Sequence, residues 1–144
     1  MDISGMAHVI LTAGDFRKST DFYRELLPAM GLKIVMDNDF MLYCVGARTA
    51  MGVRPPDKAH EGERFVQERV GLHHYCFRAK NAESVDEVYE LVNRLGAKII
   101  HAPEPGPWAP GYYSVLFEDP DGIRGEVNFV PGKGLLKEGA GMGF

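Results

Sequence analysis

The chain has 144 residues, a common size for one domain, and its 45% hydrophobic and 25% charged content is ordinary for a globular protein. Its formal net charge of −4 argues against a nucleic-acid binder, which normally needs a basic excess. No apolar run approaches the roughly 20 residues that span a bilayer, and the start, MDISGMAH, lacks the basic region of a signal peptide. Cys44 and Cys76 lie in apolar runs and indicate small buried side chains in a reducing compartment. We therefore expect a single-domain, soluble, cytoplasmic protein over residues 1–144.

A weak internal repeat organises the sequence. His8 is followed 15 residues later by Tyr23, and His74 is followed 15 residues later by Tyr89. Each half reads as a strand, a helix, a glycine and three further strands, so we expect two βαβββ modules in an α+β fold, with a helix packed behind each module of an open, curved mixed sheet. The expected parts are module one at about 6–54, a linker at 55–69, module two at about 70–130 and a Gly-rich tail at 131–144.

In the first half, the pattern predicts a strand over 7–12 and then a helix with Asp15 as its N-cap. Apolar side chains recur at helical spacing until Gly31, which ends the helix. The remaining strands of this half are predicted at 32–37, 39–45 and 49–54. The charged segment after them is expected to be a mobile connection.

In the second half, the pattern predicts a strand over 72–79 and a helix that begins with a capping box at Ser84–Glu87. Three further strands are predicted at 97–101, 112–118 and 123–130. The tail is expected to be loose, or docked only through Leu135 and Leu136.

The sequence Asp119-Pro120-Asp121-Gly122 predicts a tight turn between the last two strands. Counting outward from this turn pairs Glu126 with Leu116 and Asn128 with Ser114. The other face then holds an unbroken apolar set that suits contact with a helix. Glu126 therefore points to the face away from the helices.

The same alternation applies to the two strands that carry the repeated histidines. It places Val9 and Leu11 with the helix layer and His8 on the opposite face. It likewise places His74 on the opposite face, and the repeat favours His74 over its neighbour His73. Two histidines and one glutamate on rigid strands form the ligand set of a divalent metal site with open positions.

The chain resembles the vicinal oxygen chelate superfamily, which contains glyoxalase I, bleomycin-resistance proteins, fosfomycin-resistance enzymes and extradiol dioxygenases. The resemblance covers residues 6–130 and rests on Ala7-His8-Val9, on GLHHYCF at 71–77 and on FEDPDGIRGEV at 117–127. It implies an open barrel around one metal ion, with His8, His74 and Glu126 at the family's ligand positions. It also implies a homodimer, because members often complete the barrel with a module from a second chain.

One departure from the family pattern bears on the chemistry. Glyoxalase I and related epimerases usually hold a fourth ligand, Glu or Gln, on the fourth strand. The repeat places the counterpart of Glu126 at about Gly52, where no side chain can bind a metal or act as a base. Proton transfer is then expected from Tyr112, His101 or a bound water.

Other residues are candidates for substrate contact, each with a structural alternative. Arg78 shares the inner face by alternation, as does Arg54, and could bind a carboxylate or phosphate or form a salt bridge. Ser114 faces inward with Tyr112 and could bind substrate oxygens. Trp108, in the proline-rich loop 103–111, could form a substrate wall or pin the loop. The alternation puts His101 with Ile99, away from the cavity, which leaves its catalytic role open. The residues expected to line the cavity, Tyr43, Arg78, Trp108 and Tyr112, match no known pattern of substrate specificity, so the substrate is not predicted.

We therefore expect an enzyme that binds a small substrate through two adjacent oxygens on one divalent ion, which is Zn, Fe, Mn or Ni. Redox-inert ions suit isomerase or lyase chemistry, and iron or manganese suits dioxygenase chemistry. The alternative is a metal-free protein that sequesters a small molecule, as bleomycin-resistance proteins do. Neither reading expects nucleic acid or a membrane as a partner.

Overall fold

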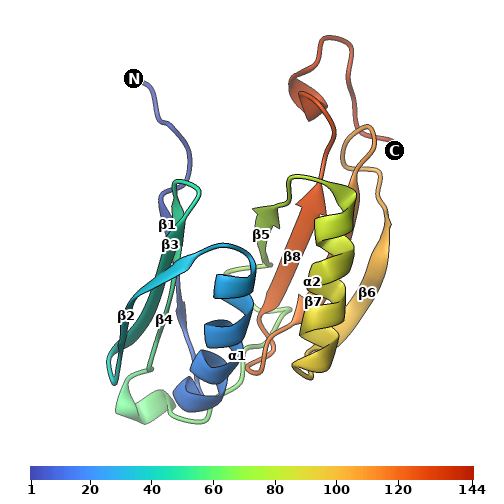
Figure 1. Ribbon diagram of the computed structural model, residues 1–144. Helices are drawn as coiled ribbons and strands as arrows, with labels where there is room; N and C mark the ends of the chain where they lie inside the picture. The colour runs from blue at the N-terminus through green and yellow to red at the C-terminus, as the bar shows by residue number, and fades with distance from the viewer. The chain divides into compact units, whose positions relative to one another are not determined.

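The computed structural model describes all 144 residues, which divide into two compact units. The first unit comprises Met1–Val66 with Pro120–Gly122, and the second comprises Gln67–Asp119 with Ile123–Phe144. Each unit contains one helix and one four-stranded mixed sheet (Figure 1). The predicted α+β class with two βαβββ modules is therefore confirmed. Neither helix has the length and apolar character needed to cross a membrane.

The first unit has the strand order β1-β4-β3-β2, with β1 parallel to β4 and the other pairs antiparallel. Its elements are β1 (His8–Thr12), α1 (Phe16–Ala29), β2 (Lys33–Asn38), β3 (Met41–Gly46) and β4 (Thr49–Arg54), followed by a short 3-10 turn, η1 (Lys58–His60). The predicted cap is present, because the Asp15 side chain accepts a hydrogen bond from the Lys18 backbone at 3.0 Å. Pro28 lies inside the last turn of α1, and Gly31 follows with a positive φ.

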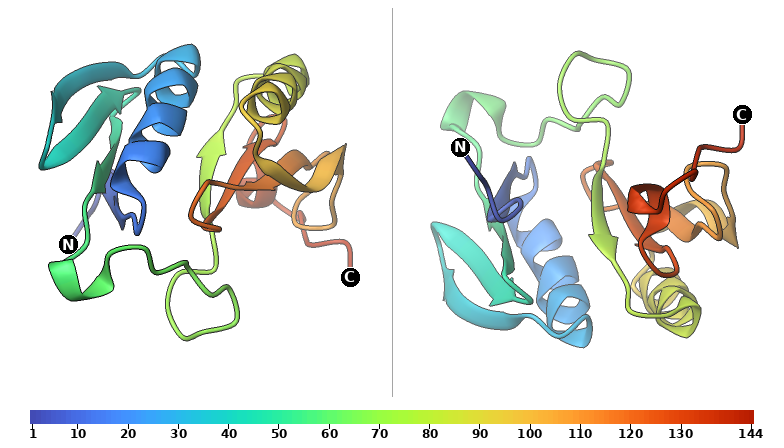
Figure 2. Two further views of the ribbon diagram at one scale, coloured as in Figure 1. Left: turned by 90° about the horizontal axis from the view of Figure 1, so that it is seen from below. Right: turned by 90° about the horizontal axis from the view of Figure 1, so that it is seen from above.

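The second unit repeats this arrangement with the order β5-β8-β7-β6. Its elements are β5 (Tyr75–Arg78), α2 (Ala82–Arg94), β6 (Lys98–Pro105), β7 (Tyr113–Glu118), β8 (Arg124–Phe129) and a 3-10 turn, η2 (Gly134–Leu136). In both views of Figure 2, each helix lies on one side of its own sheet. The other face of each sheet, called here the open face, carries no helix of its unit.

Two local predictions for this half were wrong. The cap of α2 is Asn81, whose side chain accepts from the Ser84 backbone at 2.9 Å, so Ser84 lies inside the first turn. Asn81 already provides the acceptor, and the chain is helical from Ala82. The strand predicted over 72–79 is shorter: it begins at Tyr75 and ends at Arg78, so His73 and His74 lie just before it.

Apolar burial follows the predicted alternation. In the first unit, Leu26 and Leu27 of α1 are fully buried, as are Leu42 and Val53 of the sheet. In the second unit, fully buried positions come from both layers in the same way: Val85, Val92, Val115 and Phe117. Burial of such side chains stabilises each unit by roughly 1.5–3 kcal/mol per residue. Most of the core of each unit therefore lies between its helix and the face of the sheet that the helix covers.

The segment after β4 is attached within the first unit rather than free of contacts. The Gly62 backbone donates to the Gly14 carbonyl at 3.0 Å, and the Phe65 backbone donates to the Asp121 carbonyl at 3.1 Å. Asp121 is buried, and its carboxylate accepts from the Asp15 backbone at 3.1 Å and from the Ser19 hydroxyl at 2.7 Å. The turn residue Asp121 thus satisfies donors at the beginning of α1.

Candidate functional site

The open face of the second sheet carries rows of side chains set by strand register. Leu116 pairs with Glu126 and Ser114 pairs with Asn128, as predicted from the turn. Gly122 has the positive φ that this turn needs, and the Asp119 backbone donates to the Ile123 carbonyl at 2.9 Å. Directly paired residues share a face, so one row runs across all four strands. Its members are Cys76, Glu126, Leu116 and His101.

Glu126 is the centre of a polar network on this face. Glu126 is only 8% exposed, and its Oε2 lies 3.0 Å from Nε2 of His74. The Tyr112 hydroxyl donates to its Oε1 at 2.5 Å and accepts from Nδ2 of Asn128 at 3.0 Å. The structure therefore joins three of the predicted site residues, His74, Tyr112 and Glu126, through direct contacts.

The surroundings of Glu126 favour the neutral forms of the Tyr112 hydroxyl and the Cys76 thiol. Burial, and next the hydrogen bond to Glu126, raise the pKa of Tyr112 well above its usual value. Desolvation by the surrounding protein atoms and the charge of Glu126 likewise raise the pKa of Cys76 to about 12, although part of its surface contacts solvent. Tyr112 is therefore a hydrogen-bond donor at neutral pH, and the thiol of Cys76 is a weak nucleophile.

Cys76 differs from its expected role. The sequence indicated a small buried side chain, but Cys76 is exposed on the open face, whereas Cys44 is fully buried. The reason is strand alternation, because Tyr75 before it and Phe77 after it belong to the helix side. The alternation in the sequence predicts this face for Cys76, and the pairing with Glu126 agrees with it.

A second row lies next to Glu126 along the strands. Arg78 is the register partner of Asn128, which pairs in turn with Ser114. Arg78 is exposed and forms no ion pair, while Ser114 is 4% exposed. Oδ1 of Asn128 is buried and accepts no hydrogen bond. This row therefore places the unpaired guanidinium of Arg78 and the unused acceptor of Asn128 beside the Glu126 network. Asn128 was not among the predicted site residues.

His101 lies on the open face, contrary to the predicted alternation. The pairing of β6 with β7 shifts between Ile99 and His101, so His101 pairs with Leu116 rather than continuing the pattern of Ile99. This β-bulge adds one residue to β6 and reverses the faces beyond it. The His101 ring contacts the Ala102 carbonyl at 2.9 Å and lies 3.7 Å from the carboxylate of Glu104.

The first unit carries the equivalent positions on its own open face. His8 begins β1, is exposed and packs edge-on against Tyr43, with 6.5 Å between ring centroids. Gly52 pairs with Ile10 and with Tyr43, just as Glu126 pairs with Cys76 and with Leu116. The inference that Gly52 is the counterpart of Glu126 agrees with this register.

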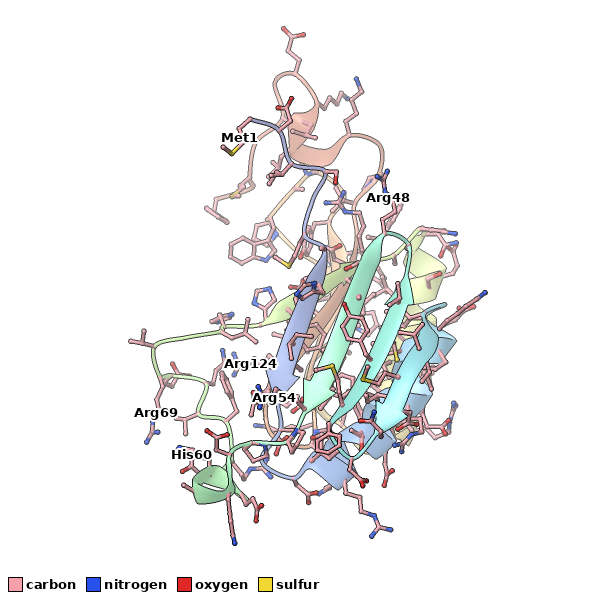
Figure 3. The ribbon with its side chains drawn as sticks, turned by 90° about the vertical axis from the view of Figure 1, so that its left-hand side faces the viewer. Met1, Arg48, Arg54, His60, Arg69 and Arg124 are labelled. Carbon is pink, nitrogen blue, oxygen red and sulfur yellow. The ribbon has the colours of Figure 1, made fainter.

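Arg54 ends β4, and the chain then leads to the turn that contains His60 (Figure 3). Arg54 is exposed at this position and forms no ion pair. Its register partner is Thr12, which the alternation assigns to the open face with His8. Arg54 therefore belongs to the open face of the first unit, as predicted.

Trp108 contacts the end of the chain. Its ring packs edge-on against Phe144 at a centroid distance of 5.3 Å, and the Gly143 backbone donates to the Pro107 carbonyl at 2.6 Å. Leu136, by contrast, is 90% exposed. The tail is therefore attached through its last residues, and the expectation of docking only through Leu135 and Leu136 was wrong.

The donor types on these faces suit a divalent metal ion, although neither unit by itself groups three or more His, Cys, Asp or Glu side chains to hold one. His8 belongs to the first unit, and His74 and Glu126 belong to the second. In the second unit an imidazole nitrogen and a carboxylate oxygen already lie 3.0 Å apart. Nitrogen and oxygen donors of this kind bind Zn, Mn, Fe or Ni.

The fold and these positions define the family. The chain belongs to the Glyoxalase/Bleomycin resistance protein/Dioxygenase superfamily, whose family model matches residues 5–127. This result confirms the resemblance to the vicinal oxygen chelate superfamily. The chain is also 25% identical over 123 residues to the uncharacterised protein YqjT of Bacillus subtilis (strain 168), covering 85% of this chain and 96% of YqjT.

Solved structures show the same fold. A candidate glyoxalase from Bacillus halodurans is 24% identical with a TM-score of 0.74, covering 88% of this chain and 96% of that one. Lactoylglutathione lyase from Agrobacterium tumefaciens is 23% identical with a TM-score of 0.64, covering 90% of this chain and 96% of that one. At these identities the likeness establishes the fold alone.

Proposed function

We propose that this protein is a metal-dependent enzyme of the vicinal oxygen chelate type. The observation that carries the proposal is the contact of His74 with Glu126 and of Glu126 with Tyr112 on the open face of the second sheet. Buried carboxylates are costly unless they are paired or coordinate a metal. The proposed ligands are His8, His74 and Glu126, and the proposed form is a cytoplasmic homodimer.

The proposed substrate is a small molecule with two adjacent oxygens, such as an α-hydroxyketone or a catechol. A bound divalent ion would supply Lewis-acid stabilisation of negative charge that develops on such a substrate. Tyr112 holds the Glu126 carboxylate in place through its hydroxyl. Because its pKa is raised, Tyr112 retains its proton and donates a hydrogen bond throughout the neutral range.

The neighbouring rows suggest how the substrate is oriented and deprotonated. Arg78 has no ion pair of its own and is proposed to bind an acidic group of the substrate, with Ser114 beside it. His101 lies in the same row as Glu126 and is proposed as a general base. Trp108 contacts Phe144, so a role as substrate wall would involve the tail as well.

The absence of a side chain at Gly52 separates this chain from four-ligand enzymes. A Cβ atom there would lie 2.7 Å from Cδ1 of Ile10 and 2.9 Å from Cδ2 of Tyr43, so these side chains take up the space of a ligand. Although one structural relative is lactoylglutathione lyase, proton transfer by a carboxylate at this position is not available here. Isomerase, lyase and dioxygenase chemistry with three protein ligands all remain compatible with the proposal.

The first test is metal content by mass spectrometry, on protein purified without affinity metals or chelators. We expect about one divalent ion per chain, and loss of that ion in His8→Ala, His74→Ala and Glu126→Ala. Glu104→Ala, which removes an exposed carboxylate of the same unit, should retain it. A wild-type protein that contains no metal, and takes up none from an excess of Zn, Mn, Fe or Ni, would refute the proposal.

A second candidate function is supported by the open face of the first unit. Ile10, Met36 and Val45 are each more than one-third exposed, although they are large and apolar. Apolar surface of this kind suits the binding of an aromatic or other apolar molecule without a metal. In that case His74→Ala would leave ligand binding intact, whereas it would abolish the activity of a metal enzyme.

A further inference from the structure

Two arginines flank Glu126 on the open face of the second sheet. Arg124, Glu126 and Asn128 alternate along β8 and therefore share this face. Arg124 and Asn128 are four residues apart, a distance of about 13 Å in an extended strand, and Glu126 lies midway between them. Arg78 is the register partner of Asn128 on the neighbouring strand β5. One position with a guanidinium group therefore lies on each side of Glu126 along the strands.

The ion pair of Arg124 leaves much of its guanidinium group unused. Its register partner on β7 is Glu118, but its Nε lies 3.6 Å from Oε1 of Glu118, beyond ordinary hydrogen-bond distance. The other oxygen of Glu118 already accepts from Nζ of Lys98 at 3.1 Å. Arg124 therefore does not form the two-point contact that a guanidinium group can make with a carboxylate, and it retains donors for a second anion.

Two buried polar atoms without partners occur at the same positions. Nε of Arg124 is a donor without an acceptor, and Oδ1 of Asn128 is an acceptor without a donor. The only other buried side-chain atom of this kind in the chain belongs to Gln67. Unpaired buried polar groups are uncommon and costly in folded proteins. Their position on both sides of Glu126 indicates a bound molecule that brings acceptors to the arginines and a donor to Asn128.

We propose that the open face of the second sheet binds a small dianion, with one acidic group on Arg78, the other on Arg124, and hydroxyl groups between them. Guanidinium groups bind carboxylates and phosphates through paired hydrogen bonds, which favours an acidic group at each end. Hydroxyl groups in the middle of the molecule can donate to Asn128 beside Glu126. For this middle part the inference rests on the proposed function, whose substrate class it narrows to dianions that carry two adjacent oxygens between their acidic groups.

Isothermal titration calorimetry on the metal-free full chain at low ionic strength tests the site. Tartrate has a carboxylate on each side of two adjacent hydroxyls, whereas glycerate keeps the two hydroxyls and has one carboxylate. We expect tartrate to bind at least about tenfold more tightly, because charge-assisted contacts at both ends add affinity. In 3-phosphoglycerate a phosphate replaces one carboxylate, so the tighter of the two dianions identifies the acidic group that the arginines prefer. Equal affinities for both dianions and for glycerate would overturn the inference.

Single arginine variants identify the two contacts. Arg78→Gln and Arg124→Gln should each weaken tartrate binding by about 10- to 100-fold. Each should change glycerate binding little, because the remaining arginine can bind its one carboxylate. Arg124→Lys keeps the charge beside Glu118 but loses the planar fork, so it should weaken tartrate binding less than Arg124→Gln. Arg94→Gln, at an exposed arginine at the end of α2, is the control and should bind tartrate like the wild type.

A zinc-loaded sample separates this inference from the proposed function. Succinate has two carboxylates and no hydroxyls, so bound zinc should tighten the binding of tartrate but not of succinate. If the chain binds no zinc while tartrate still requires both arginines, the dianion site stands and the proposed metal enzyme is refuted. If zinc binds but the loss of either arginine leaves tartrate binding unchanged, the metal site stands and the dianion site is overturned. Thermal unfolding of each variant checks that the chain is folded.

Discussion

Gly52 on β4 and Glu126 on β8 occupy equivalent positions in the two sheets. Gly52 is the partner of Ile10 on the parallel neighbour β1 and of Tyr43 on the antiparallel neighbour β3. Glu126 has the same relation to Cys76 and Leu116. One module therefore presents a carboxylate where the other presents backbone covered by an isoleucine and a tyrosine, and this asymmetry underlies the proposal of a three-ligand site.

Filling the space at Gly52 should destabilise the chain. Gly52→Ala places a methyl group 2.7 Å from Cδ1 of Ile10, and overpacking of this kind lowers the free energy of unfolding by about 1–2 kcal/mol. Because Ile10→Val removes that Cδ1 atom, the double variant should lose less than the sum of the two single variants. Urea unfolding measures each value.

Gly141→Ala is the matched control, since nothing lies within 4 Å of a Cβ at that position. A Gly52→Ala chain as stable as Gly141→Ala would show that the Ile10 and Tyr43 side chains move aside without cost.

Removal of the Tyr112 hydroxyl should reduce stability in a pH-dependent way. Tyr112→Phe deletes the bonds to Glu126 and Asn128, which should lower the free energy of unfolding by about 1–2 kcal/mol at pH 7. The folded pKa of Tyr112 is raised, so the wild-type advantage is complete below the unfolded value, near 10. It is lost as the pH rises further, because the unfolded chain releases its proton first.

Urea unfolding at pH 7 and at pH 11 tests this expectation. The gap in the free energy of unfolding between wild type and Tyr112→Phe should narrow at pH 11. A gap that stays constant or widens would contradict the raised pKa.

Cys76 should react slowly although it is exposed. With a pKa of about 12, its thiolate fraction at pH 8 is far below that of an ordinary thiol, so alkylation by iodoacetamide should be at least about a hundredfold slower than for glutathione. Glu126→Gln removes a negative charge that raises this pKa, so it should increase the rate. Mass spectrometry of tryptic peptides follows Cys76 separately from Cys44.

Glu104→Gln is the control for the loss of a carboxylate elsewhere in the same unit, and it should leave the rate unchanged. Alkylation of Cys76 as fast as that of glutathione would show that neither burial nor Glu126 suppresses its ionisation.

Asp121 should stabilise the beginning of α1. Asp121→Ala leaves the Asp15 backbone amide and the buried Ser19 hydroxyl without this acceptor, so the free energy of unfolding should fall by about 2–3 kcal/mol. Asp121→Asn keeps one acceptor oxygen and should cost less. Asp39→Ala, at an exposed position, is the control in chemical unfolding. Equal stability of Asp121→Ala and Asp39→Ala would contradict this role.

Several features of the fold could be predicted because they depend on neighbouring residues. The Asp119–Gly122 turn determines how β7 and β8 pair, so the partners of Glu126 and Asn128 were predicted correctly. The internal repeat likewise identified Gly52 as the counterpart of Glu126 before any register was known. It could also have indicated Asn81 as the cap of α2, since Asn81 stands in the repeat where Asp15 stands in the first half.

Other features depended on residues distant in the sequence. The face of His101 was predicted wrongly because the bulge after Ile99 arises from pairing with β7, and nothing in the local alternation of β6 marks it. The contact of Trp108 with Phe144 and the bond between Asp121 and Ser19 join segments far apart in the chain.

By itself, the sequence determined the two-module plan, the cap of α1, the Asp119–Gly122 turn and the partner of Glu126 on β7, because each depends on short-range backbone geometry. Only the tertiary structure decided that Tyr112 bonds to Glu126, that His101 shares the face of Glu126, and that Nδ1 of His73 meets Nδ1 of His74. Those relations depend on strand pairing, on a bulge and on ring orientation. Local sequence patterns do not reveal these three relations, because each depends on the packing of several segments at once.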